Sequence, residues 1–140
     1  MQRIQRDSWR IIETILRRYP KKKKEYEDYI LEIMASSGAR ENVNPNEEEN
    51  KPQSVTEAKA LKLNNAYYDR IKKEIEAVEF VYGGLRPEEQ KVIRMRYWKP
   101  GIRKPVPYLQ IKDTSYSERQ MKRIAYKAIT QIGRYIGEIQ

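Results

Sequence analysis

The stretch that decides the fold reads Asp113-Thr-Ser-Tyr-Ser-Glu-Arg-Gln-Met-Lys-Arg-Ile-Ala-Tyr-Lys-Ala128. It opens with small polar residues that are typical of a turn. Ser117 and Gln120 then have the spacing of a capping box, in which each side chain accepts a hydrogen bond from the other residue's backbone N–H at a helix start. Apolar residues follow at the period of one helix face: Met121, Ile124, Ala128, Ile132 and Ile136. The stretch therefore predicts a polar turn and then an amphipathic helix over residues 118–137.

The opposite face of this predicted helix is polar and basic. Its members are Arg119, Gln120, Lys122, Arg123, Tyr126, Lys127 and Thr130. Arginine can pair with guanine and glutamine with adenine in the DNA major groove, and lysines neutralise phosphates. Because the N-terminal turn of a recognition helix enters the groove, we expect one group of side chains near bases or adjacent phosphates: Ser117, Glu118, Arg119, Gln120 and Arg123. Backbone contacts are expected from Lys122, Tyr126 and Lys127.

The charge of the chain is concentrated near this helix. Residues 86–140 hold 13 Lys and Arg against 5 Asp and Glu, which accounts for nearly all of the formal net charge of +9. Such a basic segment fits double-stranded DNA as a partner. Arg103 and Lys104, in a loop bracketed by prolines, are further candidates for DNA contact. A solvated polar face is the alternative, whereas membrane adsorption is disfavoured because the apolar stripe is needed for packing.

Composition excludes several other classes of protein. With no cysteine and no histidine, the chain lacks disulfides and the commonest zinc ligands and general base. There is no phosphate-binding glycine loop and no GxSxG motif, so we expect no enzyme activity, no cofactor and no metal. No apolar run approaches the roughly 18–20 residues of a membrane span, and the N-terminus lacks a signal-peptide pattern. A cytoplasmic protein without membrane contact is expected.

The first half of the chain predicts further helices. Residues 1–35 predict a helical hairpin, because Ile4, Ile11, Ile12 and Ile15 share one helix face and Pro20 interrupts the helical pattern. Residues 36–53, with two prolines, four asparagines and almost no apolar side chains, predict a flexible linker.

A long helix is expected from Ser54, which has capping-box spacing to Glu57. Its apolar positions form a heptad-like seam from Leu61 to Tyr82. Two interpretations are open: a core helix that packs within its own domain, or a seam through which the chain forms a homo-oligomer. Gly83-Gly84 is expected to end this helix.

Two more helices are predicted before the final one. Pro87 begins a helix that buries the apolar residues Val92, Ile93, Tyr97 and Trp98. A short helix over residues 108–112 follows, anchored by Leu109 and Ile111. The prediction is an all-α chain with a hairpin (1–35), a linker (36–53), and a central helix plus helix-turn-helix DNA-binding domain (54–140).

Leu85-Arg-Pro-Glu-Glu-Gln-Lys-Val-Ile-Arg-Met-Arg-Tyr-Trp98, followed by Ser117-Glu-Arg-Gln-Met-Lys-Arg-Ile124, resembles region 4 of bacterial sigma factors, a helix-turn-helix that reads promoter DNA. The whole chain is similar to the RinA/ArpU-type phage transcriptional regulators, which share Tyr19-Pro20, Glu32-Ile-Met34 and the order of segments. The resemblance implies a regulator, and more specifically an activator, of phage or prophage genes in a bacterial host cell, with host RNA polymerase as a partner. One departure is that residues 108–115 lack the small residue and the glycine usual in this motif.

Two other classes remain open alongside the regulator. A phage small terminase subunit also combines DNA binding with helical oligomerisation. A protein-interaction adaptor of the anti-sigma type would use the basic face to bind an acidic protein.

Overall fold

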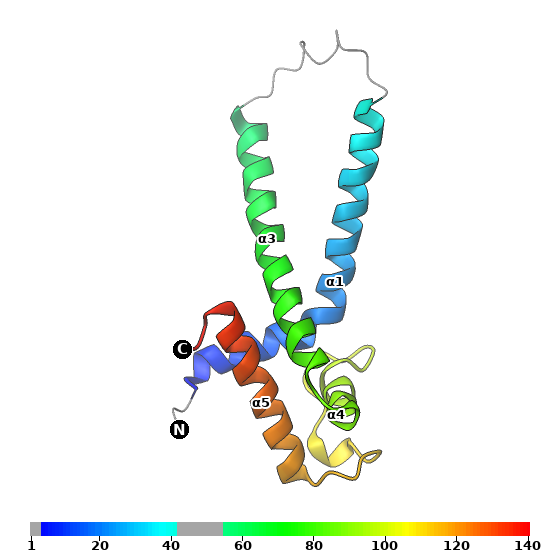
Figure 1. The fold of residues 1–140 in the computed structure, drawn as a ribbon, viewed down its shortest axis with the longest axis vertical. Helices are drawn as coiled ribbons and strands as arrows, with labels where there is room; N and C mark the ends of the chain where they lie inside the picture. Colours follow the sequence, from blue (N-terminus) through cyan, green and yellow to red (C-terminus); the bar gives the residue numbers. More distant parts are fainter. Residues whose placement is uncertain (1–3, 42–54) are drawn as a thin grey trace. The chain divides into compact units, whose positions relative to one another are not determined.

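The protein is all-helical in its described part. The computed structural model describes residues 4–41 and 55–140, with side chains for residues 4–35 and 65–140. These ranges contain α1 (Arg6–Glu41), α3 (Val55–Gly83), α4 (Pro87–Tyr97), the 3-10 helix η1 (Tyr108–Gln110) and α5 (Glu118–Ile136), and no strand (Figure 1). The predicted all-α class is confirmed, as are the long central helix and its end at Gly83.

The predicted interruption at Pro20 is wrong, because Pro20 lies inside α1. Proline has no backbone N–H, so it leaves the carbonyl four residues earlier without its helical donor. That carbonyl belongs to Leu16, and the Trp98 indole Nε1 donates to it at 2.7 Å. A residue 82 positions away in sequence therefore supplies the missing hydrogen bond, and the helix continues.

The chain divides into two compact units, Met1–Pro20 with Lys73–Gln140, and Lys21–Lys72. The first unit is built from the start of α1, the end of α3, α4 and α5. Its core contains buried side chains from all four helices: Ile12, Leu16, Ala77, Val78, Val81, Val92, Ile93, Tyr97, Met121, Ile124, Ala125, Ala128, Ile129 and Ile132.

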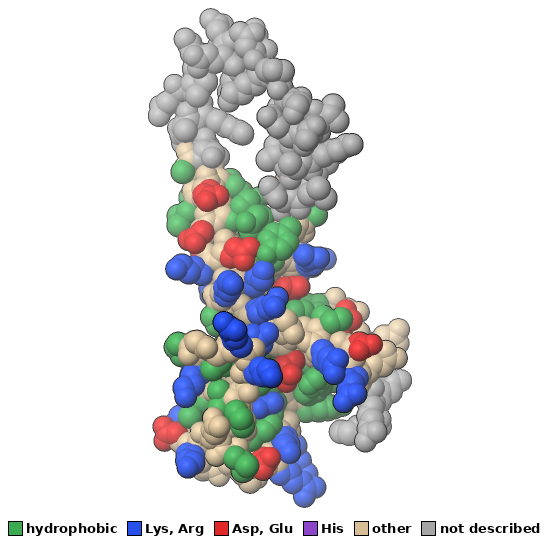
Figure 2. Space-filling model, turned by 180° about the vertical axis from the view of Figure 1, so that it is seen from behind, with side chains coloured by type: hydrophobic (Ala, Val, Ile, Leu, Met, Phe, Trp, Pro, Cys, Tyr) green, Lys and Arg blue, Asp and Glu red, His purple; other side chains and the backbone are tan. Residues whose placement is uncertain are grey.

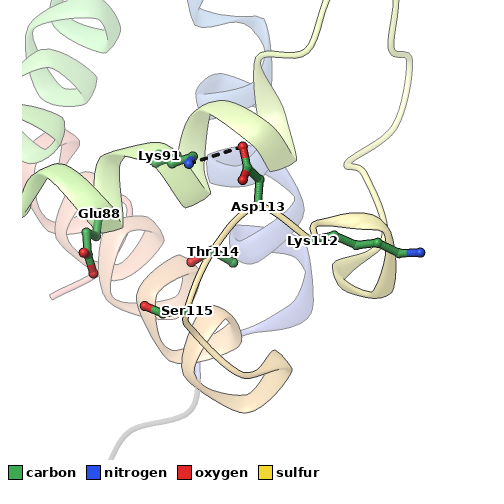
Figure 3. Close-up of a pocket in the computed structure, with 6 residues that line it drawn as sticks. All are labelled: Glu88, Lys91, Lys112, Asp113, Thr114 and Ser115. Carbon is green, nitrogen blue, oxygen red and sulfur yellow. Dashed lines mark ion pairs between the residues drawn. The ribbon is translucent and has the colours of Figure 1, made fainter.

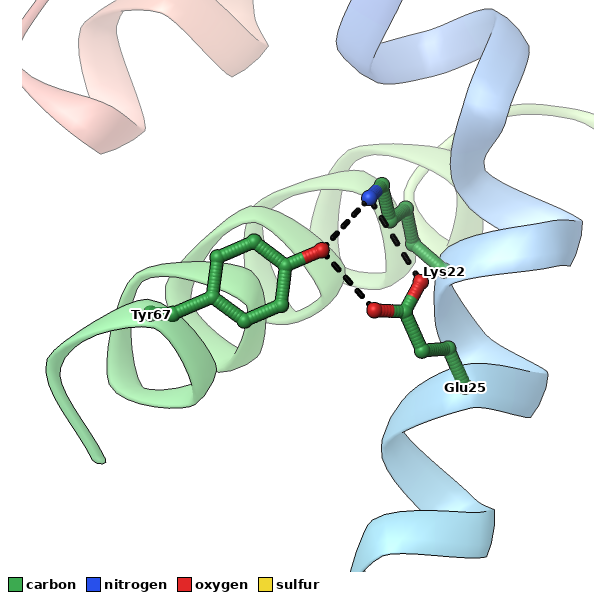
Figure 4. A network of polar contacts seen from close by, with 3 residues as sticks. All are labelled: Lys22, Glu25 and Tyr67. Atoms are coloured by element: carbon green, nitrogen blue, oxygen red, sulfur yellow. Dashed lines mark hydrogen bonds and ion pairs between the residues drawn. The ribbon is translucent and has the colours of Figure 1, made fainter. Parts of the chain in front are cut away.

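The second unit pairs residues of α1 with residues of α3 through polar and aromatic contacts. The Tyr67 hydroxyl donates to Glu25 at 2.8 Å and accepts from Lys22 Nζ at 2.8 Å (Figure 4). The hydrogen bond to Tyr67 is the main reason that the pKa of Lys22 is raised. The rings of Tyr29 and Tyr68 stack with centroids 3.6 Å apart. Among the described side chains of this unit only Ile71 is buried, so polar and ring contacts hold the two helices together.

The heptad-like seam of α3 is an intramolecular surface where the structure describes it. Ile71, Ile75 and Val78 are 2 %, 7 % and 1 % exposed within the single chain. These side chains are not available to a second copy, so the interpretation of the seam as an oligomer interface is wrong for them. The seam spacing matched a coiled coil because packing on the chain's own helices requires the same one-sided pattern.

Several predictions fall wholly or partly outside the described residues. The capping box at Ser54 and the side chain of Leu61 are among them. Of the predicted flexible linker, residues 36–41 belong to α1, and the remainder lies outside the described ranges.

Candidate nucleic-acid interface

Helix α5 is fixed at both ends by local hydrogen bonds. At its start the predicted capping box is present: Gln120 N donates to Ser117 Oγ at 3.2 Å, and Ser117 N donates to Gln120 Oε1 at 2.8 Å. At its end Gly137 adopts the left-handed conformation, with φ of 82°, which an L side chain rarely adopts. The apolar face predicted from sequence is buried from Met121 to Ile132, so the helix is held rigidly on its scaffold.

The opposite face carries a row of three exposed cations, Arg119, Arg123 and Lys127, which we call the basic row. Residues four apart lie on successive turns, about 6 Å apart along the axis. No hydrogen bond or ion pair joins these three side chains to another residue in the described part of the chain. Their charged ends are therefore free to bind an external anion.

The other residues predicted at the start of α5 have partners within the protein. Lys122 Nζ lies 3.3 Å from Glu118 Oε1, one turn earlier. Ser117 and Gln120 use their side-chain oxygens in the cap. The Gln120 side-chain oxygen accepts one of the two cap hydrogen bonds, which helps to fix the first turn on which Arg119 stands.

Tyr126, in the second half of the predicted polar face, is covered by the start of α1. The ring of Trp9 stacks on that of Tyr126, with centroids 5.7 Å apart and planes 26° apart. Thr130, predicted to be exposed, is half-buried, and its hydroxyl oxygen is buried without a hydrogen-bond partner among the described residues. The predicted polar face is therefore partly covered: Tyr126 and Thr130 are half-buried, whereas Lys127 between them stays exposed.

Gly133 is the reason that α1 can lie so close to α5. A Cβ at this position would lie 2.6 Å from Ile12 Cδ1 and 2.5 Å from Ile139 Cδ1. Such distances are too short for carbon atoms, so a side chain at position 133 would require Ile12 and Ile139 to shift. The close crossing positions Trp9 over Tyr126.

The element before α5 differs from the prediction. The expected helix over residues 108–112 is the three-residue 3-10 helix η1, because Pro105 and Pro107 lack backbone donors and fix the chain in an extended form just before it. Leu109, predicted as an anchor, is 77 % exposed, whereas Ile111 is 5 % exposed as predicted. The motif is thus a short 3-10 turn followed by a long helix.

Arg96 holds the loop before η1, a role that sequence reasoning missed. Its Nη1 donates to the Val106 carbonyl at 2.8 Å, and its guanidinium carbon lies 3.8 Å from the centroid of the Tyr108 ring. Burial raises the pKa of Tyr108, although the nearby Arg96 charge opposes this shift. The only signal in the sequence is a basic residue between the largely apolar positions Met95 and Tyr97.

Arg103 and Lys104 lie in the loop that Arg96 anchors, and both are exposed. Figure 2 shows Lys and Arg side chains spread over one face of the molecule. The loop and the basic row therefore both present cations to solvent, as expected from the charge distribution.

A polar hollow of about 440 Å³ lies between α4 and the turn that leads into α5 (Figure 3). Lys91 Nζ and Asp113 Oδ2 lie 3.4 Å apart across it. Thr114 Oγ1 accepts from Tyr116 N at 3.2 Å, which shapes the turn. Since two acidic and two basic residues line the hollow, its charges balance and it offers no strong anion site of its own.

The described ranges, 4–41 and 55–140, contain no group of three or more His, Cys, Asp or Glu side chains placed to hold a metal ion. No helix among them is long and apolar enough to cross a membrane. Comparison with family models, curated proteins and solved structures finds no match for this chain.

Proposed function

We propose that this protein is a sequence-specific DNA-binding transcriptional regulator that inserts the first half of α5 into the major groove. The observation that carries the proposal is the basic row. Arg119, Arg123 and Lys127 are exposed, without partners in the described chain, and aligned on one side of a helix whose other side is buried. The forked guanidinium group of arginine can donate two hydrogen bonds to guanine, and this is the commonest base-specific contact between proteins and DNA.

Each part of the interface has a distinct task in this proposal. The cap and the apolar face fix the position of α5, so binding does not have to order it. Arg119 and Arg123, on the first two turns, reach base edges or the phosphates beside them. Lys127 and the loop residues Arg103 and Lys104 contact phosphates, which adds affinity without sequence preference.

Selection of bound sequences from a random DNA pool tests the proposal directly. A regulator enriches a defined site, and substitution Arg119→Ala or Arg123→Ala should then weaken binding to that site by about 1–3 kcal/mol and relax the preference at one position. Lys127→Ala should weaken binding to all DNA sequences alike. Arg18→Ala, which removes an exposed charge from α1 instead, serves as the control for net charge and should leave the preference intact.

Other outcomes would favour the competing classes. If no sequence is enriched and no DNA affinity is detected near 50 mM salt, the favoured class is an adaptor that binds an acidic protein. A large ring of subunits, detected by sedimentation, would favour a small terminase subunit. Contact with host RNA polymerase and activation of phage genes are part of the proposal and rest on the sequence resemblance. Transcription from the selected site with purified polymerase tests both.

A further inference from the structure

We propose that the start of α1 is a second DNA-contacting element, in which Arg6 and Arg10 bind backbone phosphates beside the groove that α5 enters. This inference rests on the proposed function, because it extends the same DNA surface. It assigns DNA contacts to the start of α1, which lies more than 100 residues before α5 in the sequence.

Two contacts fix how α1 crosses α5. Ile12 Cδ1 lies against Gly133, and the ring of Trp9 stacks on that of Tyr126. Tyr126 precedes Gly133 by seven residues, or about 10 Å along the α5 axis. On the surface of α1, the direction from Ile12 to Trp9 therefore points towards the N-terminal half of α5, where the basic row lies.

Arg6 and Arg10 occupy the next positions around α1 in that same direction. At 100° per residue, they lie about 60° and about 100° beyond Trp9. Both are exposed, and neither forms a hydrogen bond or ion pair with another residue in ranges 4–41 and 55–140. Counted from Ile12, which packs on Gly133, Arg6 lies about 120° and Arg10 about 160° around α1. Arg6 thus extends the open basic surface past Tyr126, and Arg10 continues it onto the outer side of α1.

The acidic residues beside these two arginines are Glu13 and Asp7. Glu13 accepts a hydrogen bond from the Tyr97 hydroxyl at 2.9 Å and lies 4.0 Å from Arg96. Asp7 is exposed and lies about 100° from Arg6 and about 60° from Arg10 around the helix. A phosphate beside Arg6 and Arg10 therefore meets two cations and one exposed carboxylate, so the local charge on this face stays positive.

The structure also explains why these arginines can contribute to affinity. Side chains on a helix that moves independently of α5 would add little, because binding would have to order it. The start of α1 is instead packed into the core of the first unit, with Ile12 and Leu16 at 0 % and 1 % exposure. Arg6 and Arg10 are thereby held at a fixed position relative to the basic row.

The test is the salt dependence of DNA binding by the full chain, measured by fluorescence anisotropy with a labelled duplex carrying the selected site and with a random duplex. Each lost phosphate contact should make the slope of log K against log salt about 0.9 less negative. Arg10→Ala should change the slope by about 0.9 and the Arg6→Ala/Arg10→Ala double variant by about 1.8, equally for both duplexes. Arg18→Ala is the control for net charge, because Arg18 is exposed on the same helix but lies about two turns beyond Arg10, about 12 Å further along the axis.

The outcomes separate this inference from the proposed function. If the unaltered chain binds neither duplex, the proposed function and this inference both fail. If the chain binds and Arg123→Ala weakens binding, but the double variant keeps the original slope, only the contribution of α1 is overturned. A change for Arg18→Ala equal to that for Arg10→Ala would show a general effect of net charge and would also overturn it.

Discussion

The hydrogen bond from Trp98 to the Leu16 carbonyl makes a sharp prediction about how a proline is accommodated inside α1. The indole Nε1 donates at 2.7 Å to the carbonyl that Pro20 leaves without a helical donor. Leu16 is 1 % exposed, so water cannot readily replace the indole. Substitution Trp98→Phe keeps an aromatic ring against Tyr19 and Tyr82 but removes the donor.

The expected cost has two parts. An unsatisfied buried carbonyl destabilises the folded state by about 1–3 kcal/mol, and the smaller ring also loses packing. Substitution Pro20→Ala restores a backbone N–H at the position that can donate to the same carbonyl. In the Pro20→Ala background, Trp98→Phe should therefore destabilise the protein only through the lost packing of the ring. The two costs should therefore differ by the cost of the unsatisfied carbonyl, about 1–3 kcal/mol, which is the coupling energy of the double-mutant cycle.

Urea unfolding followed by far-ultraviolet circular dichroism measures all four members of this cycle. Tryptophan fluorescence is unsuitable because one of the two tryptophans is changed. The slope of the free energy against urea should be the same in every variant, since the surface exposed on unfolding hardly changes. Equal costs of Trp98→Phe with and without Pro20 would refute the reasoning, because they would show that the indole bond does not compensate for the proline.

Three further predictions follow from the packing and the cap. Ile12→Ala should lower the free energy of unfolding by about 2–5 kcal/mol, because Ile12 is fully buried and the change leaves a cavity. Ile11→Ala, next to it but 48 % exposed, should cost below about 1 kcal/mol; equal costs would show that α1 does not pack as described. Burial raises the pKa of Tyr97 well above its usual value near 10. The neutral form is therefore favoured in the folded state, and stability that is complete below about pH 10 should fall as the pH rises further. Tyr97→Phe should make this alkaline loss less steep in urea titrations, and an unchanged pH dependence would contradict the assignment. Ser117→Ala should cost about 1 kcal/mol of stability by removing the cap of α5, whereas a neutral result in thermal unfolding would show that the capping box contributes little.

The sequence predicted the parts of this protein whose causes are local. The capping box of Ser117 and Gln120 and the apolar face from Met121 depend on residues within a few turns of one another, so spacing alone reveals them. The same periodicity places Arg119, Arg123 and Lys127 on the exposed side. The all-α class follows because every long segment with an apolar period has the period of a helix.

Tertiary structure decided the features whose causes lie far away in the chain. Pro20 should end a helix by local rules, yet it lies inside α1 because Trp98 supplies the missing donor. The polar face of α5 is partly covered because Trp9 stacks on Tyr126, and nothing in the spacing of α5 indicates that contact. Local periodicity fixes which side of a helix is apolar, but which other helix covers it depends on long-range packing, here on the small volume of Gly133.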